Sequence, residues 1–240
     1  MNNQYDAFDL DRNEYSFNQY IQSVFVYMSL GLLTTSAVSY LCFRSFVGRG
    51  MVYKMLVSFP YAFIPIVLIE LALSYAMGRF IYKLNRMQLF AMFFLYAALN
   101  GLSFSTIFIV YRLSDIFMAF VFATGFFISM AVIGKTTRLD LTKYRTIFIA
   151  GLISLSIFSI IALFLRYEKL DLVLCWTGLL LFMGLTAYDI QKVRNIYYNY
   201  AGDMETASKL GILGAFELYL DFINLFMYIL RILSNKRRRD

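Results

Sequence analysis

The chain has 240 residues, of which 60% are hydrophobic and only 15% are charged, and its mean hydropathy is +0.65. A soluble domain is rarely more than about half apolar, so the composition excludes an ordinary soluble fold and predicts an integral membrane protein. The formal net charge of +7 does not indicate nucleic-acid binding. The basic residues fall in short loops and in the tail KRRR at 236–239, where they are typical of topology signals and of contact with membrane lipid.

Histidine is absent from the sequence, which excludes imidazole metal sites and histidine-based acid–base mechanisms. Cys42 and Cys175 both lie in apolar runs, where a thiol usually serves as a small apolar side chain. The sequence therefore predicts neither a disulfide framework nor a cofactor.

The chain begins with a polar N-terminal tail, residues 1–20, that lacks the basic start of a secretory signal, so we expect the first span to be retained. Apolar runs follow, each near the roughly 20 residues that a helix needs to cross a bilayer. These runs are 21–43, 55–78, 88–110, 115–134, 146–165, 172–191 and 210–233. They lack the alternation of barrel strands, which leaves helices. Short loops join them, so we expect an all-α polytopic protein with one transmembrane domain, 21–234, and a basic C-terminal tail, 235–240.

The distribution of Lys and Arg leaves the last run open to two interpretations. If all seven runs cross, the two sides receive equal numbers of basic residues; if the last run does not cross fully, the side of the N-terminus is strongly favoured. The last run is thus a seventh span or a re-entrant element. We expect seven helices and a cytoplasmic N-terminus.

Acidic residues inside the apolar runs are the candidate functional groups. They are Glu70, Asp189, Glu217 and Asp221, whereas no basic residue lies deep in a run and Arg79 is the nearest. A carboxylate at bilayer depth costs about 3 kcal/mol or more unless it is paired, wetted or protonated, so such a residue is by default a functional candidate.

In the last run the polar residues share one helical face. Glu217, Asp221, Asn224 and Tyr228 follow helical spacing. This spacing predicts a buried helix whose polar stripe faces a wet cavity. The alternative is a purely structural network of hydrogen bonds between helices.

Four segments resemble one known family. They are YAALNGLSFSTIFIVY at 96–111, TTRLDL at 136–141, GLTAYDIQKVRNIY at 184–197 and LGILGAFELYLDFINLFMYILRIL at 210–233. They are similar to the motifs of the Bax-inhibitor family, the transmembrane Bax inhibitor motif proteins, in its bacterial form. The resemblance implies a seven-helix bundle with the last helix central. It also implies a pH-sensitive calcium leak whose sensor and weak calcium site are Asp189 and Asp221, with Arg79 as the candidate for a latch on Asp189.

The residues suggest how such a leak would work. Two carboxyls within hydrogen-bonding distance in a site of low dielectric constant share a proton, and its loss adds repulsion that separates their helices and attracts a divalent cation. We expect Glu217, Asn224 and Glu70 to be supporting polar residues, and Glu217 to add negative potential. The pair requires that the sixth helix continue past Lys192 or that the seventh begin before Gly211. The expected function is a passive calcium leak rather than an enzyme.

Two other functions stay open. The chain could be a partner-binding regulator of a membrane protease or of stress and cell-death signalling, without transport of its own, and the basic tail is its sole docking feature. The remote alternative is an aspartyl intramembrane protease. Tyr188 and Asp189 fit the first motif of such proteases, but Asp221 follows Tyr219 and Leu220 instead of the glycine-any-glycine that the second motif requires.

Overall fold

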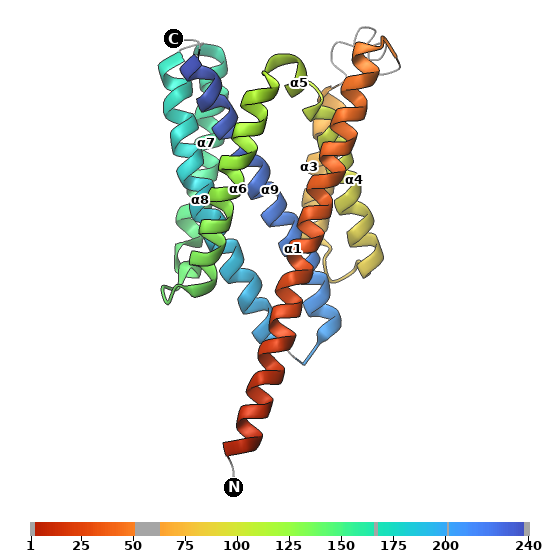
Figure 1. Ribbon diagram of the computed structural model, residues 1–240, viewed down its shortest axis with the longest axis vertical. Coiled ribbons are helices and arrows are strands. Elements are labelled where there is room, and N and C mark those ends of the chain that lie inside the picture. The colour runs from red at the N-terminus through yellow and green to blue at the C-terminus, as the bar shows by residue number, and fades with distance from the viewer. Residues whose placement is uncertain (1–2, 51–62, 166–167, 201, 238–240) are drawn as a thin grey trace. The chain divides into compact units, whose positions relative to one another are not determined.

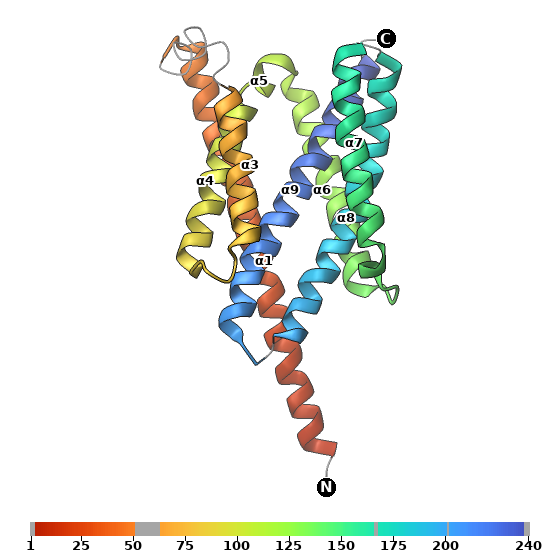
Figure 2. The same ribbon diagram turned by 180° about the vertical axis from the view of Figure 1, so that it is seen from behind.

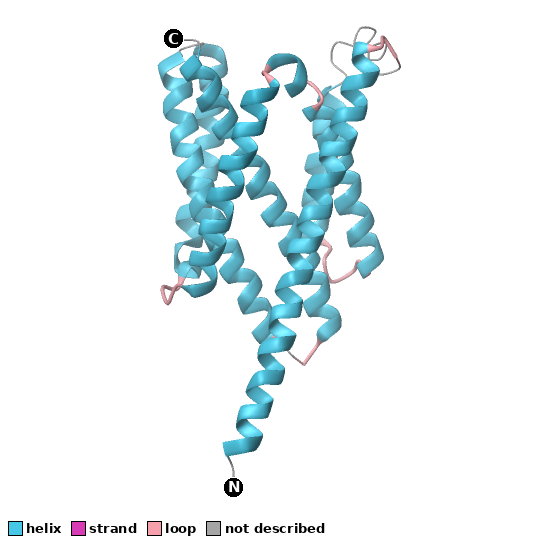
Figure 3. Ribbon diagram, viewed as in Figure 1, coloured by secondary structure: helices cyan, strands magenta, loops and turns pink. Residues whose placement is uncertain are grey.

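The computed structural model describes residues 3–50, 63–165, 168–200 and 202–237, and every regular element in these ranges is a helix (Figure 3). The long helices are α1 (Asn3–Val47), α3 (Phe63–Arg79), α4 (Arg86–Phe104), α6 (Leu113–Thr136), α7 (Arg145–Leu165), α8 (Glu168–Asn199) and α9 (Met204–Arg237). The short α5 (Ile107–Val110) follows α4 within one candidate membrane span, and the 3-10 helix η1 (Leu141–Tyr144) precedes α7 within another. The predicted all-α fold is confirmed.

Six of the helical segments in the described ranges are long and apolar enough to cross a membrane. They include α9, which is one continuous helix of 34 residues. The described part of α3 has 17 residues, and the beginning of the predicted run 55–78 lies outside the described residues. The chain is therefore a polytopic membrane protein.

The chain forms two compact units. The first comprises Met1–Ser105 with Val193–Phe216, and the second comprises Thr106–Lys192 with Glu217–Asp240. Helices α8 and α9 are continuous and contribute to both units. In its most apolar stretch α9 is 61% buried, against 6% for the stretch that contains α7. The last helix is therefore an interior element, whereas α7 exposes most of its surface to lipid.

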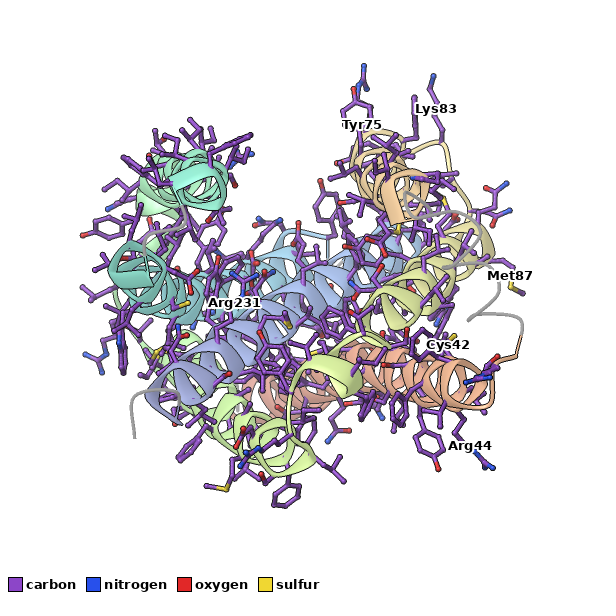
Figure 4. All side chains as sticks on the ribbon, turned by 90° about the horizontal axis from the view of Figure 1, so that it is seen from above. Cys42, Arg44, Tyr75, Lys83, Met87 and Arg231 are labelled. Atoms are coloured by element: carbon purple, nitrogen blue, oxygen red, sulfur yellow. The ribbon has the colours of Figure 1, made fainter. Side chains whose placement is uncertain are left out.

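In the first unit, α1 and α3 both pack on α4, as both ribbon views show (Figures 1 and 2). Thr35 of α1 donates a hydrogen bond of 2.9 Å to the carbonyl oxygen of Ala97. A Cβ added to Gly101 would lie 2.7 Å from the Thr35 carbonyl oxygen, so the two backbones are in direct contact there. Phe216 of α9 packs edge-on against Phe93 of α4. Tyr75 of α3 and Lys83 of the following turn project away from these helices (Figure 4).

In the second unit, α6, α7 and η1 accompany the second part of α9 and most of α8. Phe222 of α9 makes edge-on ring contacts with Phe120 and Phe127 of α6. The backbone of α6 at Gly134 lies close to α8, because an added Cβ would be 2.4 Å from the Ala187 carbonyl oxygen. This unit holds both aspartates that the sequence singles out.

Candidate functional site

Asp189 lies well inside α8 and not at its end. The helix continues through Lys192 to Asn199, and α9 begins at Met204, before Gly211. Hydropathy placed the end of the sixth span at residue 191, because polar residues follow it. The helix extends further, so the condition that sequence reasoning set for a pairing of Asp189 with Asp221 is met.

The carboxyl groups of Asp189 on α8 and Asp221 on α9 lie close enough to interact directly. Both residues are buried, with 8% and 4% of their surfaces exposed. Two ionised carboxylates have no donor between them, so a hydrogen bond between these groups would need a proton on at least one of them. Thr186, one turn before Asp189, also contacts the Asp221 carboxyl. The Oδ2 atom of Asp221 is buried and has no hydrogen-bond partner in the described structure.

A basic residue accompanies the pair, although sequence reasoning placed none deep in a span. Lys192 lies within the membrane-spanning part of α8, and its Nζ atom is 2.6 Å and 2.7 Å from the two carboxylate oxygens of Glu217. Their side chains are 36% and 26% exposed. Lys192 therefore offsets part of the negative potential that Glu217 is expected to add beside the aspartates. Lys192 was missed because it follows the apolar run, but its spacing of one helical turn from Asp189 was a usable signal.

The polar stripe of α9 faces α8. Moving along α9 from Glu217 and Asp221, the Tyr228 ring lies 5.9 Å from that of Phe182, and the Asn235 amide donates to Asp171 at 3.3 Å. Along this series of contacts the residue numbers rise on α9 and fall on α8, so the two helices are antiparallel.

Two further members of this face have local partners. Arg231, labelled in Figure 4, lies near Cys175 of α8. Asn224 donates from its Nδ2 atom to the carbonyl oxygen of Leu220, one turn earlier, at 2.8 Å. The Asn224 donor therefore serves its own helix.

The remaining predicted residues belong to the first unit. Glu70 of α3 is half-buried, and its Oε1 atom accepts a hydrogen bond of 3.5 Å from the Ser103 hydroxyl of α4. Arg79 is exposed at the end of α3, with its guanidinium 5.9 Å from the centre of the Phe80 ring. The latch between Arg79 and Asp189 stays a prediction. No group of three or more acidic, cysteine or histidine side chains in the described ranges is arranged to hold a metal ion.

Comparison with known proteins identifies the family. The family model described as "Inhibitor of apoptosis-promoting Bax1" matches residues 17–238. The inner membrane protein YbhL of Escherichia coli is 36% identical over 219 residues, which cover 91% of this chain and 92% of that protein. An uncharacterised protein of Borreliella burgdorferi is 34% identical over 220 residues, with 92% and 93% coverage. A Rickettsia prowazekii protein, RP147, is 36% identical over 222 residues, with 91% and 90% coverage. With its apolar spans, the chain is an integral protein of the bacterial inner membrane, and it belongs to the Bax inhibitor-1 family.

Proposed function

We propose that the chain is a passive calcium leak gated by pH, with Asp189 and Asp221 as the sensor. The observation that carries the proposal is the proximity of these two buried carboxyls on facing helices. A proton shared between them would hold α8 and α9 together. When it leaves, two negative charges face each other in a site of low dielectric constant, and their repulsion favours separation of the helices.

Once they are deprotonated and separated, Asp189 and Asp221 form a site suited to permeation of a cation rather than to its tight binding. Calcium prefers six to eight oxygen ligands, whereas the pair offers two carboxylates next to a Glu217 that already binds Lys192. Water must supply the other ligands. A site with few protein ligands binds weakly and releases readily, as conduction requires. The family resemblance implies calcium as the permeant ion, and the leak that we propose uses no cofactor.

The test is calcium flux into liposomes that contain the purified protein, across a series of pH values. We expect flux to rise with pH in the parent. Asp221→Asn and Asp189→Asn each put a neutral amide in the pair, so their flux should stay low and lose its pH dependence. Asp171→Asn is the matched control: Asp171 is also on α8 and bonded to α9, through Asn235, but it is outside the pair. Flux in Asp171→Asn should follow the parent curve.

Two results would contradict the leak. Parent flux that is insensitive to pH, or a parent curve that Asp221→Asn leaves unchanged, would remove the sensor role of the pair. Absence of flux from the parent, together with co-purification of a stable membrane partner, would favour the regulatory function. Cleavage of a transmembrane peptide that either aspartate variant abolishes would favour the protease.

A further inference from the structure

The buried side chain of Gln191 ties the loop between α6 and η1 to α8. Its Oε1 atom accepts a hydrogen bond of 2.7 Å from the backbone N–H of Leu141, and its Nε2 atom donates one of 2.8 Å to the carbonyl oxygen of Leu139. Gln191 is only 2% exposed. One amide thus binds a donor and an acceptor in a segment about fifty residues away in the chain. An ionised carboxylate of the same length could bind only the N–H of Leu141, because it has no proton to donate to the carbonyl of Leu139.

The same face of α8 is held by α6. A Cβ added to Gly134 would lie 2.4 Å from the Ala187 carbonyl oxygen and 3.0 Å from the Cβ of Ile190, so the helices touch there without an intervening side chain. Ala187, Ile190 and Gln191 point towards α6 and its loop. Asp189 points to the other side, to Asp221 of α9. Residues two apart in a helix lie on nearly opposite faces, which agrees with this division.

We propose that Gln191 is a positioning residue that fixes the rotation and height of α8, so that Asp189 meets Asp221. A hydrogen bond between two carboxyls tolerates little displacement. Backbone contact at Gly134 limits how closely α6 and α8 approach, but it does not by itself prevent α8 from sliding or turning. The two bonds of Gln191 supply that restraint at the next turn of the helix. The loop segment Leu139–Leu141 thus helps to hold α8 in the position that the contact between Asp189 and Asp221 requires.

The placement of the restraint has a consequence for gating. α6 and the loop hold α8 on the face opposite Asp221. As long as Gln191 keeps both bonds, the aspartates therefore separate by movement of α9. Without these two bonds α8 can also move, and the free-energy difference that favours the closed state over the open state becomes smaller. This role rests on the proposed leak, whereas the restraint itself can be measured without any flux.

The first experiment therefore measures distance. Leu139 and Leu180 of α8 are 67% and 66% exposed, so cysteines at both positions can carry spin labels, in a background with Cys42→Ser. We expect a narrow distance distribution in the parent and a broadened one in Gln191→Met, which keeps the length of the side chain but cannot donate. Gln88→Met is the matched control, because Gln88 also accepts from a backbone N–H, that of Asn85, but in the first unit. It should leave the distribution narrow.

The second experiment measures flux on the same variants at the acidic end of the pH series, where the parent leaks least. Loss of the restraint should raise flux from Gln191→Met by about fivefold, the effect of one net hydrogen bond on a two-state equilibrium. Gln191→Asn, which retains the amide on a shorter side chain, should fall between parent and Gln191→Met in both measurements. It also serves as the test if Gln191→Met fails to fold.

The outcomes separate the two proposals. A distribution that stays narrow in both Gln191 variants would overturn the restraint. A broadened distribution with an unchanged flux curve would leave Gln191 a structural residue and overturn its positioning role. If the parent shows no pH-dependent flux, the proposed leak fails. The inference about gating fails with it, and the distance measurement then decides the restraint alone.

Discussion

Gly134→Ala tests the contact between α6 and α8 that supports Asp189. The new Cβ would lie 2.4 Å from the Ala187 carbonyl oxygen and 3.0 Å from the Ala187 Cα atom. Carbon–oxygen contacts of this kind normally measure about 3.3–3.6 Å, so the helices must separate by about 1 Å. The obstacle is backbone, which cannot turn aside as a side chain can. Overpacking of this type costs about 1–3 kcal/mol.

A control in the same helix isolates that cost. Nothing lies within 4 Å of a Cβ added to Gly125. Both substitutions gain the same helix propensity, about 1 kcal/mol in favour of alanine. The difference in unfolding free energy between Gly134→Ala and Gly125→Ala is therefore the packing cost alone. For a chain of this size 1 kcal/mol corresponds to about 2–4 °C in Tm.

The assay is the loss of monodisperse protein on heating in detergent, followed by size-exclusion chromatography. We expect the Tm of Gly134→Ala to lie about 2–12 °C below that of Gly125→Ala. In flux measurements Gly134→Ala should also weaken the closed state at acidic pH, whereas Gly125→Ala should follow the parent. Equal Tm values for the two variants would show that α6 and α8 are not in backbone contact at Gly134.

Three further predictions concern other contacts. Lys192→Met should lower stability by about 1–2 kcal/mol, a value between those of exposed and buried ion pairs because Lys192 and Glu217 are 36% and 26% exposed. Glu217→Gln should cost less, since Lys192 also lies near Asp189; equal losses in thermal unfolding would contradict this account. Thr35→Val should cost about 0.6 kcal/mol by loss of the bond to Ala97, whereas Thr34→Val, which loses only a bond to Leu30 within α1, should be near neutral in the same assay. The Thr142 hydroxyl and the Thr142 N–H lower the pKa of Asp140. The stability that Asp140→Ala removes should therefore be present above about pH 4 and should vanish as pH falls through the folded-state pKa. If thermal unfolding still shows a difference between the parent and Asp140→Ala in strong acid, that cause is excluded.

Hydropathy and helical spacing predicted the fold because lipid leaves few alternatives. Apolar runs of span length must be helices, and the spacing of Glu217 and Asp221 placed both on one face of the last helix. The predicted span 172–191 ends before the helix does. Hydropathy includes the cost of placing Lys192 in lipid but not the ion pair that Lys192 forms with Glu217. Once the charge is paired, the helix continues to Asn199.

Other features of the site could not be predicted because they depend on which helices are neighbours. Periodicity shows that Asp221 lies on a polar face, but not that the facing helix is α8. Gln191 lies within the motif GLTAYDIQKVRNIY, but the motif does not show what it binds, since its partners are backbone groups of Leu139 and Leu141, which any sequence would supply. The supporting role of Asn224 stays a prediction. It shares the face of Asp221, and its amide donor is bonded to the carbonyl of Leu220 in its own helix.

The charges around the pair explain why two aspartates, rather than the whole acidic cluster, would sense pH. Lys192 and Glu217 form an ion pair at 2.6 Å, so together they add no net charge to the site. The net charge of the four residues is then set by Asp189 and Asp221 alone. It is zero with two protons on the pair, −1 with one and −2 with none. A buried cluster with uncompensated charge is costly, and each proton lost therefore increases the tendency of α9 to leave α8 and admit water or a cation. Because the charges of Glu217 and Lys192 act on Asp189 but do not take part in the proposed proton sharing, removing Glu217 should change the pH at which the leak opens, whereas removing either aspartate should abolish the response.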